Sequence, residues 1–254
     1  MRDSLLRLTR VSRSFGPVDV LDALTLDIHR GEFVAVVGPS GCGKTTLLNL
    51  LSGYDKPSSG TIARSGTVRM VYQQSGLFPW KTAEENVRLG LRHVTDEAEK
   101  KRQIRQLFGL IGLEGFGGHY PHQLSGGMQQ RVELARALAG DSDLLLMDEP
   151  FSALDYITRL KMRGELARLL HERPRTVVLV THDIEEAAQL ADRVFVLSGR
   201  PAQVRREIHI SLERPRDITH PEVVNAMHTV LAELGLEKNG MQAAPSAVLS
   251  GGIV

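Results

Sequence analysis

The chain has 254 residues, of which 42% are hydrophobic and 24% charged, so its composition is that of a globular protein and excludes a collagen-like, disordered or coiled-coil chain. Its formal net charge of +1 gives no general attraction to nucleic acid, and we expect no nucleic-acid partner. The single cysteine excludes an internal disulfide framework. No apolar run approaches the ~18 residues of a membrane span, so a role at a membrane would require docking on another protein.

Hydrophobic periodicity predicts an α/β fold in which strands and helices alternate along the chain. Strands are expected at residues 5–11, 24–28, 33–37, 61–62, 68–72, 144–147, 176–180, 194–197 and 204–210. Helices are expected at residues 44–51, 96–111, 128–138, 157–170, 183–190 and 221–236, and another begins at a capping box formed by Thr82 and Glu85.

The middle of the chain interrupts this alternation. Residues 81–140 carry helical patterns and a glycine-rich break at 109–118, so we expect a mainly helical insert. Residues 238–254 are rich in Gly, Ala and Ser and have no periodicity, so we expect a disordered tail after one folded unit over residues 1–237.

A phosphate loop follows the predicted strand at 33–37 and opens the next helix, with the pattern G-x-x-x-x-G-K-[ST]. Its glycines let backbone N–H groups turn toward an anion, and the helix directs the positive end of its dipole to the same place. Lys44 supplies a positive charge for the terminal phosphates, the Thr45 hydroxyl is suited to Mg²⁺, and Cys42 is expected to fill space. The predicted nucleotide-binding residues are Gly38, Pro39, Ser40, Gly41, Cys42, Gly43, Lys44, Thr45 and Thr46.

Two further strands bring polar residues to the same edge of the sheet. Asp148 and Glu149 follow the apolar run at 144–147, at the carboxyl end where α/β sheets bind ligands. We expect Asp148 to bind Mg²⁺ and Glu149 to accept a proton from an attacking water, the alternative being two acids that cap the next segment. His182 follows the strand at 176–180 and is placed to contact a γ-phosphate, although a lone histidine is more often structural.

A second anion-binding helix start is predicted at Ser125, where a serine and two glycines precede a helix. Two such helix starts in one chain predict either two bound anions or a site that serves a partner.

These motifs, in this order, resemble the ABC transporter ATPase family over about residues 5–198. The resemblance implies a P-loop NTPase core with an N-terminal antiparallel β-subdomain and an inserted helical signature subdomain, within an ABC ATPase domain at residues 1–237. It also implies a head-to-tail homodimer that holds two ATP molecules, each between the phosphate loop of one copy and the signature segment of the other. The signature residues are Leu124, Ser125, Gly126, Gly127, Met128 and Gln129.

The same resemblance implies roles for further residues. Gln73 would bind Mg²⁺ and water, His182 would contact the γ-phosphate, and these two would join Lys44 and Glu149 as the catalytic set. Phe15 lies where the family places an aromatic ring against adenine, the alternative being a core phenylalanine at a strand end. The residues expected to form a loop across the dimer interface are Ser152, Ala153, Leu154 and Asp155.

A finer similarity connects residues 71–80, 86–87 and 212–216 with importers of nitrate, taurine and aliphatic sulfonates, although Gln74 stands where relatives often carry an acid. It implies an ATP-hydrolysing subunit on the cytoplasmic face of the inner membrane that energises uptake of a small anion through a permease, with a solute-binding protein acting indirectly. Phe78, Pro79 and Trp80 would contact the permease, the alternative being a Trp80 buried under the loop.

Two other functions remain open at this point. The first is an ABC ATPase without a permease, against which the near-neutral charge and single nucleotide domain argue. The second is a P-loop switch that signals by binding rather than by turnover, against which Asp148, Glu149 and His182 argue.

Overall fold

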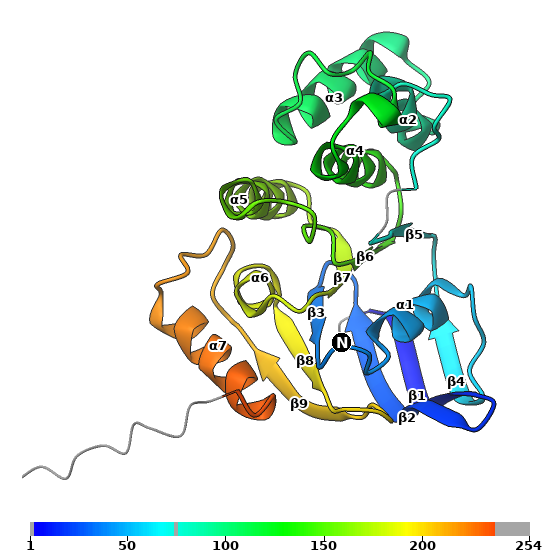
Figure 1. The fold of residues 1–254 in the computed structure, drawn as a ribbon, viewed down its shortest axis with the longest axis vertical. Helices are drawn as coiled ribbons and strands as arrows, with labels where there is room; N and C mark the ends of the chain where they lie inside the picture. Colours follow the sequence, from blue (N-terminus) through cyan, green and yellow to red (C-terminus); the bar gives the residue numbers. More distant parts are fainter. Residues whose placement is uncertain (1–2, 74–75, 237–254) are drawn as a thin grey trace, which may run out of the picture.

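The computed structural model describes residues 3–73 and 76–236, and it confirms the predicted α/β fold (Figure 1). A three-stranded antiparallel sheet has the order β2-β1-β4, with β1 (Ser4–Phe15), β2 (Val18–His29) and β4 (Ser59–Arg64). A six-stranded sheet has the order β5-β6-β7-β3-β8-β9, with β3 (Phe33–Val37), β5 (Val68–Val71), β6 (Leu144–Asp148), β7 (Thr176–Val180), β8 (Arg193–Leu197) and β9 (Val204–His209). The second sheet is parallel except for β9, which pairs antiparallel to β8.

The helices are α1 (Lys44–Ser52), α2 (Ala83–Arg88), α3 (Glu97–Leu110), α4 (Gly126–Leu138), α5 (Tyr156–Glu172), α6 (Ile184–Leu190) and α7 (Pro221–Glu233), with short 3₁₀ turns η1 (Leu89–Leu91) and η2 (Pro121–Gln123). In Figure 1, α2, α3 and α4 lie together at one end of the molecule and the two sheets lie at the other. None of the helices within residues 3–73 and 76–236 is long and apolar enough to cross a bilayer.

The central strands are apolar because both faces of their sheet are covered. In β3, Val34 and Val36 join one core with the antiparallel sheet and α1, whereas Ala35 and Val37 join the opposite core with α5 and α6. Successive side chains of a strand point to opposite faces, so a strand between two cores is apolar at every position. This arrangement brings the carboxyl ends of β3, β5, β6 and β7 to one edge of the sheet.

Several predicted boundaries were wrong for local reasons. Helix α4 begins at Gly126 rather than at residue 128, because the Ser125 hydroxyl accepts from the Met128 N–H and the two glycines form the first turn. Strands β1 and β2 extend beyond the predicted 5–11 and 24–28, since Arg10 and Ala23 adopt φ of 49° and the register shifts beside them break the alternation. The predicted tail at 238–254 lies outside the described residues.

Candidate functional site

The phosphate loop connects β3 to α1 and leaves the start of the helix open to an anion. Gly43 caps α1 with φ of 118°, and a Cβ there would lie 2.7 Å from Val20 Cγ1, so only glycine fits. No side chain caps α1, so the N–H groups of its first turn are not occupied by the chain's own cap. Cys42 is buried, and burial raises the pKa of its thiol, as expected of a space-filling residue.

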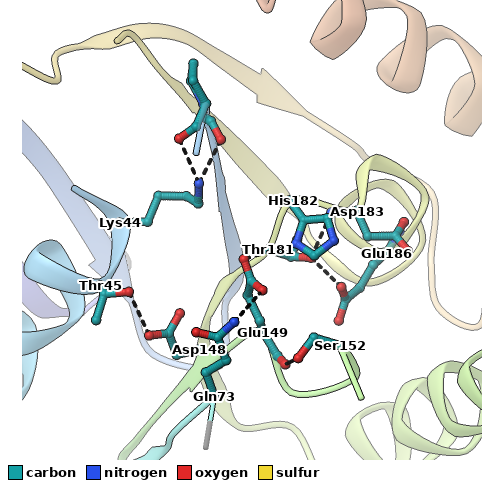
Figure 2. Close-up of polar contacts among 12 residues, drawn as sticks. Lys44, Thr45, Gln73, Asp148, Glu149, Ser152, Thr181, His182, Asp183 and Glu186 are labelled. Atoms are coloured by element: carbon teal, nitrogen blue, oxygen red, sulfur yellow. Dashed lines mark hydrogen bonds and ion pairs between the residues drawn. The ribbon is translucent and has the colours of Figure 1, made fainter. Parts of the chain in front are cut away.

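Two cationic side chains contact the backbone of this loop. The Lys44 ammonium donates to Gly38 O at 2.7 Å and to Pro39 O at 3.1 Å (Figure 2). From the turn after β8, Arg200 Nη2 donates to Gly41 O at 2.6 Å. The loop is therefore an electropositive cradle as well as a set of backbone donors.

Thr45 and Asp148 come together from α1 and the end of β6, with Thr45 Oγ1 donating to Asp148 Oδ2 at 2.9 Å (Figure 2). Burial raises the pKa of Asp148, although the hydrogen bond from Thr45 opposes that rise. A hard cation offsets the desolvation of such a carboxylate, so the hydroxyl and carboxylate oxygens fit Mg²⁺. Within residues 3–73 and 76–236 no group of three His, Cys, Asp or Glu side chains is placed to hold a metal, so an ion here needs phosphate or water ligands as well.

The carboxylate of Glu149 is the meeting point of three chain segments. It accepts from Gln73 Nε2 at 3.1 Å and lies 3.0 Å from His182 Nδ1. The backbone of Glu149 has φ of 48°, which is uncommon outside glycine and is found at functional sites. The structure thus brings Gln73, Glu149 and His182 together. The alternative that Asp148 and Glu149 cap the next segment is wrong, because their carboxylates contact other segments and Asp155 caps α5 instead.

The segment that carries His182 is fixed from behind by Glu186. Thr181 Oγ1 donates to Glu186 Oε2 at 2.5 Å and accepts from the Asp183 N–H at 3.0 Å (Figure 2). Glu186 is buried, and this burial raises its pKa to about 7. These contacts orient the backbone around His182, whose own side chain remains exposed beside Glu149.

The second predicted helix start lies apart from the first. Figure 1 places α4 in the helical group, away from α1, so one small anion cannot occupy both starts in one chain. A Cβ on Gly127 would lie 3.0 Å from Ala153 O, which explains this glycine within the chain. A Cβ on Gly126 would meet no atom within 4 Å, so packing inside the chain does not require glycine there.

The aromatic residues singled out in the sequence are exposed. Phe15 is 48% exposed, and the Arg13 guanidinium carbon lies 4.3 Å from its ring centroid, so the alternative of a core phenylalanine is wrong. Trp80 is 69% exposed and its ring centroid lies 5.4 Å from that of Phe78, so the alternative of a buried Trp80 is also wrong. Pro79, which lies between Phe78 and Trp80 in the sequence, is exposed as well.

The loop after Glu149 already has contacts within its own chain. Ser152 Oγ donates to Glu149 O at 2.9 Å, and Ala153 O packs against Gly127 of the signature segment. Leu154 is buried, and the Asp155 side chain accepts from the Thr158 N–H at the start of α5. The loop is therefore held between the carboxyl end of β6 and the signature helix.

Comparison with known proteins decides the family. Residues 21–152 match the sequence model of the family described as ABC transporter. The chain belongs to the ABC transporter ATP-binding family. It is therefore an ATP-binding protein and an ATPase.

Individual relatives span most of the chain. An aliphatic sulfonates import ATP-binding protein, SsuB 2 of Mesorhizobium japonicum, is 45% identical and covers 93% of this chain and 94% of its own length. The taurine import ATP-binding protein TauB of Pelagibacter ubique is 43% identical and covers 76% of each chain. Among solved structures, a post-hydrolysis dimer of the ATP-binding cassette MJ0796 with ADP and Pi has a TM-score of 0.71 at 35% identity and covers 80% of this chain and 98% of that one.

Sequence reasoning missed four side chains of this ABC ATPase site: Arg13, Gln130, Glu186 and Arg200. Gln130 and Arg200 reach Glu149 and Gly41 from distant segments, so no local spacing marks them. Arg13 lies two residues before Phe15 in the same strand, a spacing that every strand contains, and Glu186 contacts Thr181 next to His182. The one local signal belonged to Glu186, which follows Asp183 by three residues, but that pattern predicts only a helix cap, and Asp183 does accept from the Glu186 N–H.

Proposed function

We propose that this chain is the ATP-hydrolysing subunit of an importer for small sulfonate-type anions, and that it works as a head-to-tail homodimer on the cytoplasmic face of the inner membrane. The observation that carries the proposal is the convergence of Thr45, Asp148 and Glu149 at one edge of the parallel sheet while the signature helix start lies elsewhere. A complete site for ATP then needs a second copy of the chain.

The phosphate-loop half binds the nucleotide. The N–H groups at the start of α1 and the Lys44 ammonium bind the phosphates of ATP, and the exposed ring of Phe15 stacks on adenine. The position of Arg13 against Phe15 supports this role, because the guanidinium packs on the ring while the side chain stays 48% exposed and open to a base.

Thr45, Asp148 and Gln73 hold Mg²⁺ in this proposal. The ion supplies neutralisation of the charge on the phosphate oxygens when it is bound. The hydrogen bond between Thr45 and Asp148 supports the assignment, because it places the hydroxyl of α1 2.9 Å from the carboxylate oxygen at the end of β6. Gln73 lies close to this pair, because its side chain contacts Glu149, the residue after Asp148.

Glu149 accepts the proton of the attacking water. Gln73 and His182 orient its carboxylate from either side, and His182 also contacts the γ-phosphate. Phosphoryl transfer needs mainly positioning and charge stabilisation, so a fixed carboxylate beside a cationic cradle is the required arrangement.

The signature half acts on the ATP of the other copy. Ser125, Gly126 and Gly127 present the first turn of α4 to its γ-phosphate. The unexplained glycine at position 126 supports a close approach from outside the chain, because nothing inside it requires that residue. The dimeric state of the similar cassette supports the same assembly.

The permease contact is assigned to the exposed aromatic segment Phe78, Pro79 and Trp80. Large exposed aromatic side chains are typical of the centre of protein interfaces. The names of the two import relatives support a sulfonate-type solute, which a separate solute-binding protein would deliver to the permease.

Uptake by the assembled transporter tests this function. Proteoliposomes that contain this chain, its permease and its binding protein should accumulate taurine or an alkanesulfonate when ATP is on the side of this chain. The Lys44→Ala variant should abolish accumulation. Failure of this chain to co-purify with any multi-span membrane protein would favour an ABC ATPase without a permease. An ATPase rate equal to that of Lys44→Ala would favour a switch.

A further inference from the structure

Gln130 lies on α4 one residue after the signature segment, and its side chain leaves that helix. It is 2% exposed. Its Nε2 donates to Glu149 O at 3.1 Å and to Ser152 Oγ at 3.4 Å, and its Oε1 accepts from the Ala153 N–H at 3.0 Å. One buried amide therefore connects the signature helix with the backbone of the proposed general base and with the loop after it.

The Glu149 end of this connection is conformationally demanding. Glu149 adopts φ of 48°, a region that residues other than glycine occupy rarely and only when their surroundings hold them there. Its carbonyl accepts from the N–H and Oγ of Ser152 as well as from Gln130. Because the backbone angle sets the direction of the side chain, these donors help to fix the carboxylate between Gln73 and His182.

The other end of the connection is the helix start that faces the partner's ATP. Ser125 caps α4 five residues before Gln130, and the Gly127 backbone lies close against Ala153 O. A helix moves as a rigid element, so a shift of Ser125 toward a phosphate also shifts Gln130.

The neighbouring glutamine does not share this connection. Gln129 Nε2 donates to Pro121 O and Leu124 O, which both belong to the helical group. The two successive glutamines thus point to different parts of the molecule, and Gln130 is the one that reaches Glu149.

We infer that Gln130 is a positioning residue that couples the two ATP sites of the dimer. Docking of α4 on the ATP bound by the partner shifts Gln130, which aligns Glu149 on the ATP bound by its own subunit. The inference rests on the proposed dimer, in which signature and general base of one chain serve different nucleotides. Coupling between sites in proteins is typically about 5–150-fold, and we expect an effect in that range.

Kinetics of homodimers give the first test. Gln130→Leu should lower kcat by about tenfold and leave the ATP affinity of single subunits unchanged. Gln130→Glu keeps the length of the side chain and the acceptor for the Ala153 N–H but loses both donor contacts, and it should lower kcat by a similar factor. This variant keeps the inference testable if Gln130→Leu does not fold. The control is Gln103→Leu, since Gln103 donates to Glu99 one turn earlier in α3. An unchanged kcat in Gln130→Glu would overturn the inference.

Mixed dimers of two differently tagged copies separate coupling from a merely structural role. The first copy carries Glu149→Gln, so only ATP bound by the second copy is hydrolysed. Ser125→Ala in the second copy then removes a contact to the first copy's ATP, which does not turn over. Phosphate release is measured at a protein concentration that keeps the dimer fully formed in MgATP.

In these dimers Ser125→Ala should lower phosphate release at least fivefold when the second copy has Gln130, and less than twofold when it also carries Gln130→Glu. An equal fold-change in both backgrounds would overturn the coupling role while leaving the dimer intact. Phosphate release could also be unaffected by Ser125→Ala both in these mixed dimers and in homodimers that carry it in both copies. That result would contradict the proposed dimer site itself.

Discussion

The starts of α1 and α4 use the same backbone device in different settings. Both begin a helix at glycines, α1 without a side-chain cap and α4 with the Ser125 hydroxyl accepting from the Met128 N–H. Around α1 the chain gathers Lys44, Thr45 and Asp148, whereas the start of α4 carries a neutral hydroxyl cap and a glycine that its own chain does not explain. In the proposed dimer the two starts are therefore unequal halves of one site, of which one supplies the chemistry and the other completes the cradle.

Removing the proposed general base should give the largest effect. It tests only the charged half of the site, which is the phosphate loop with Thr45, Asp148, Glu149 and the residues that contact them. Glu149→Gln should lower turnover by about 10²–10⁴-fold, the usual contribution of a positioned general base, and should leave ATP binding intact. Phosphate release and equilibrium nucleotide binding measure the two properties separately. Turnover at the level of the unaltered protein would remove Glu149 from this role.

Blocking the signature half should be the next largest effect. Ser125→Arg should lower turnover by about 10²–10³-fold, the typical loss when one donor to a developing oxyanion is removed. The ATP affinity of the single subunit should stay within about twofold, in contrast to Lys44→Ala, which should lose it. Loss of affinity in the isolated Ser125→Arg subunit would place both helix starts at one nucleotide and break the comparison.

The charged half also contains a buried acid whose titration affects folding. Burial raises the pKa of Glu186 to about 7, above its usual 4.5, so the folded chain binds a proton between these values that the unfolded chain does not. Stability from this group is therefore present at pH 5 and lost as the pH rises through 7. Between pH 5 and pH 8 the unaltered protein should lose this contribution to its free energy of unfolding, and Glu186→Gln should not. The change in the free energy of unfolding over this range should therefore differ between the two proteins by up to about 3 kcal/mol.

Urea unfolding at both pH values measures this difference. The control is Glu185→Gln, since Glu185 is the adjacent acid on the same helix and is paired with Arg163. The same pH dependence in Glu186→Gln and the unaltered protein would show that Glu186 does not titrate as its burial implies.

The adenine contact should give the smallest change. Phe15→Ala should weaken ATP binding by about 5–150-fold, which corresponds to the ~1–3 kcal/mol of a base–aromatic stack. Tyr54→Ala is a matched control, because Tyr54 is an exposed aromatic residue outside the proposed site. Equal affinity of the two variants in a fluorescent-nucleotide titration would argue against stacking on Phe15.

The sequence predicted the core of the fold where hydrophobic pattern and topology agree. The continuous apolar run of β3 ends at the phosphate loop, and those of β6 and β7 end at Asp148 and before Thr181. Parallel strands necessarily deliver these three ends to one edge. The long hairpin of β1 and β2 was shortened in the prediction because positive φ at Arg10 and Ala23 interrupts the alternation on which strand prediction depends.

The missed parts of the site depend on tertiary contacts. Gln130 and Glu186 are polar residues on helices, and in a sequence such residues resemble a solvated face. Their roles become visible only when folding buries them against Glu149 O and Thr181. By contrast, the phosphate loop is recognisable locally, because its glycines and helix start are adjacent in the chain.

The mass of the Glu149→Gln variant in solution tests the central claim most directly. Light scattering at saturating MgATP should give twice the mass of one chain, and adding Ser125→Arg to the same variant should return it to the mass of one chain. If Glu149→Gln keeps the mass of a single chain under these conditions, ATP is not held between two copies and the account is contradicted.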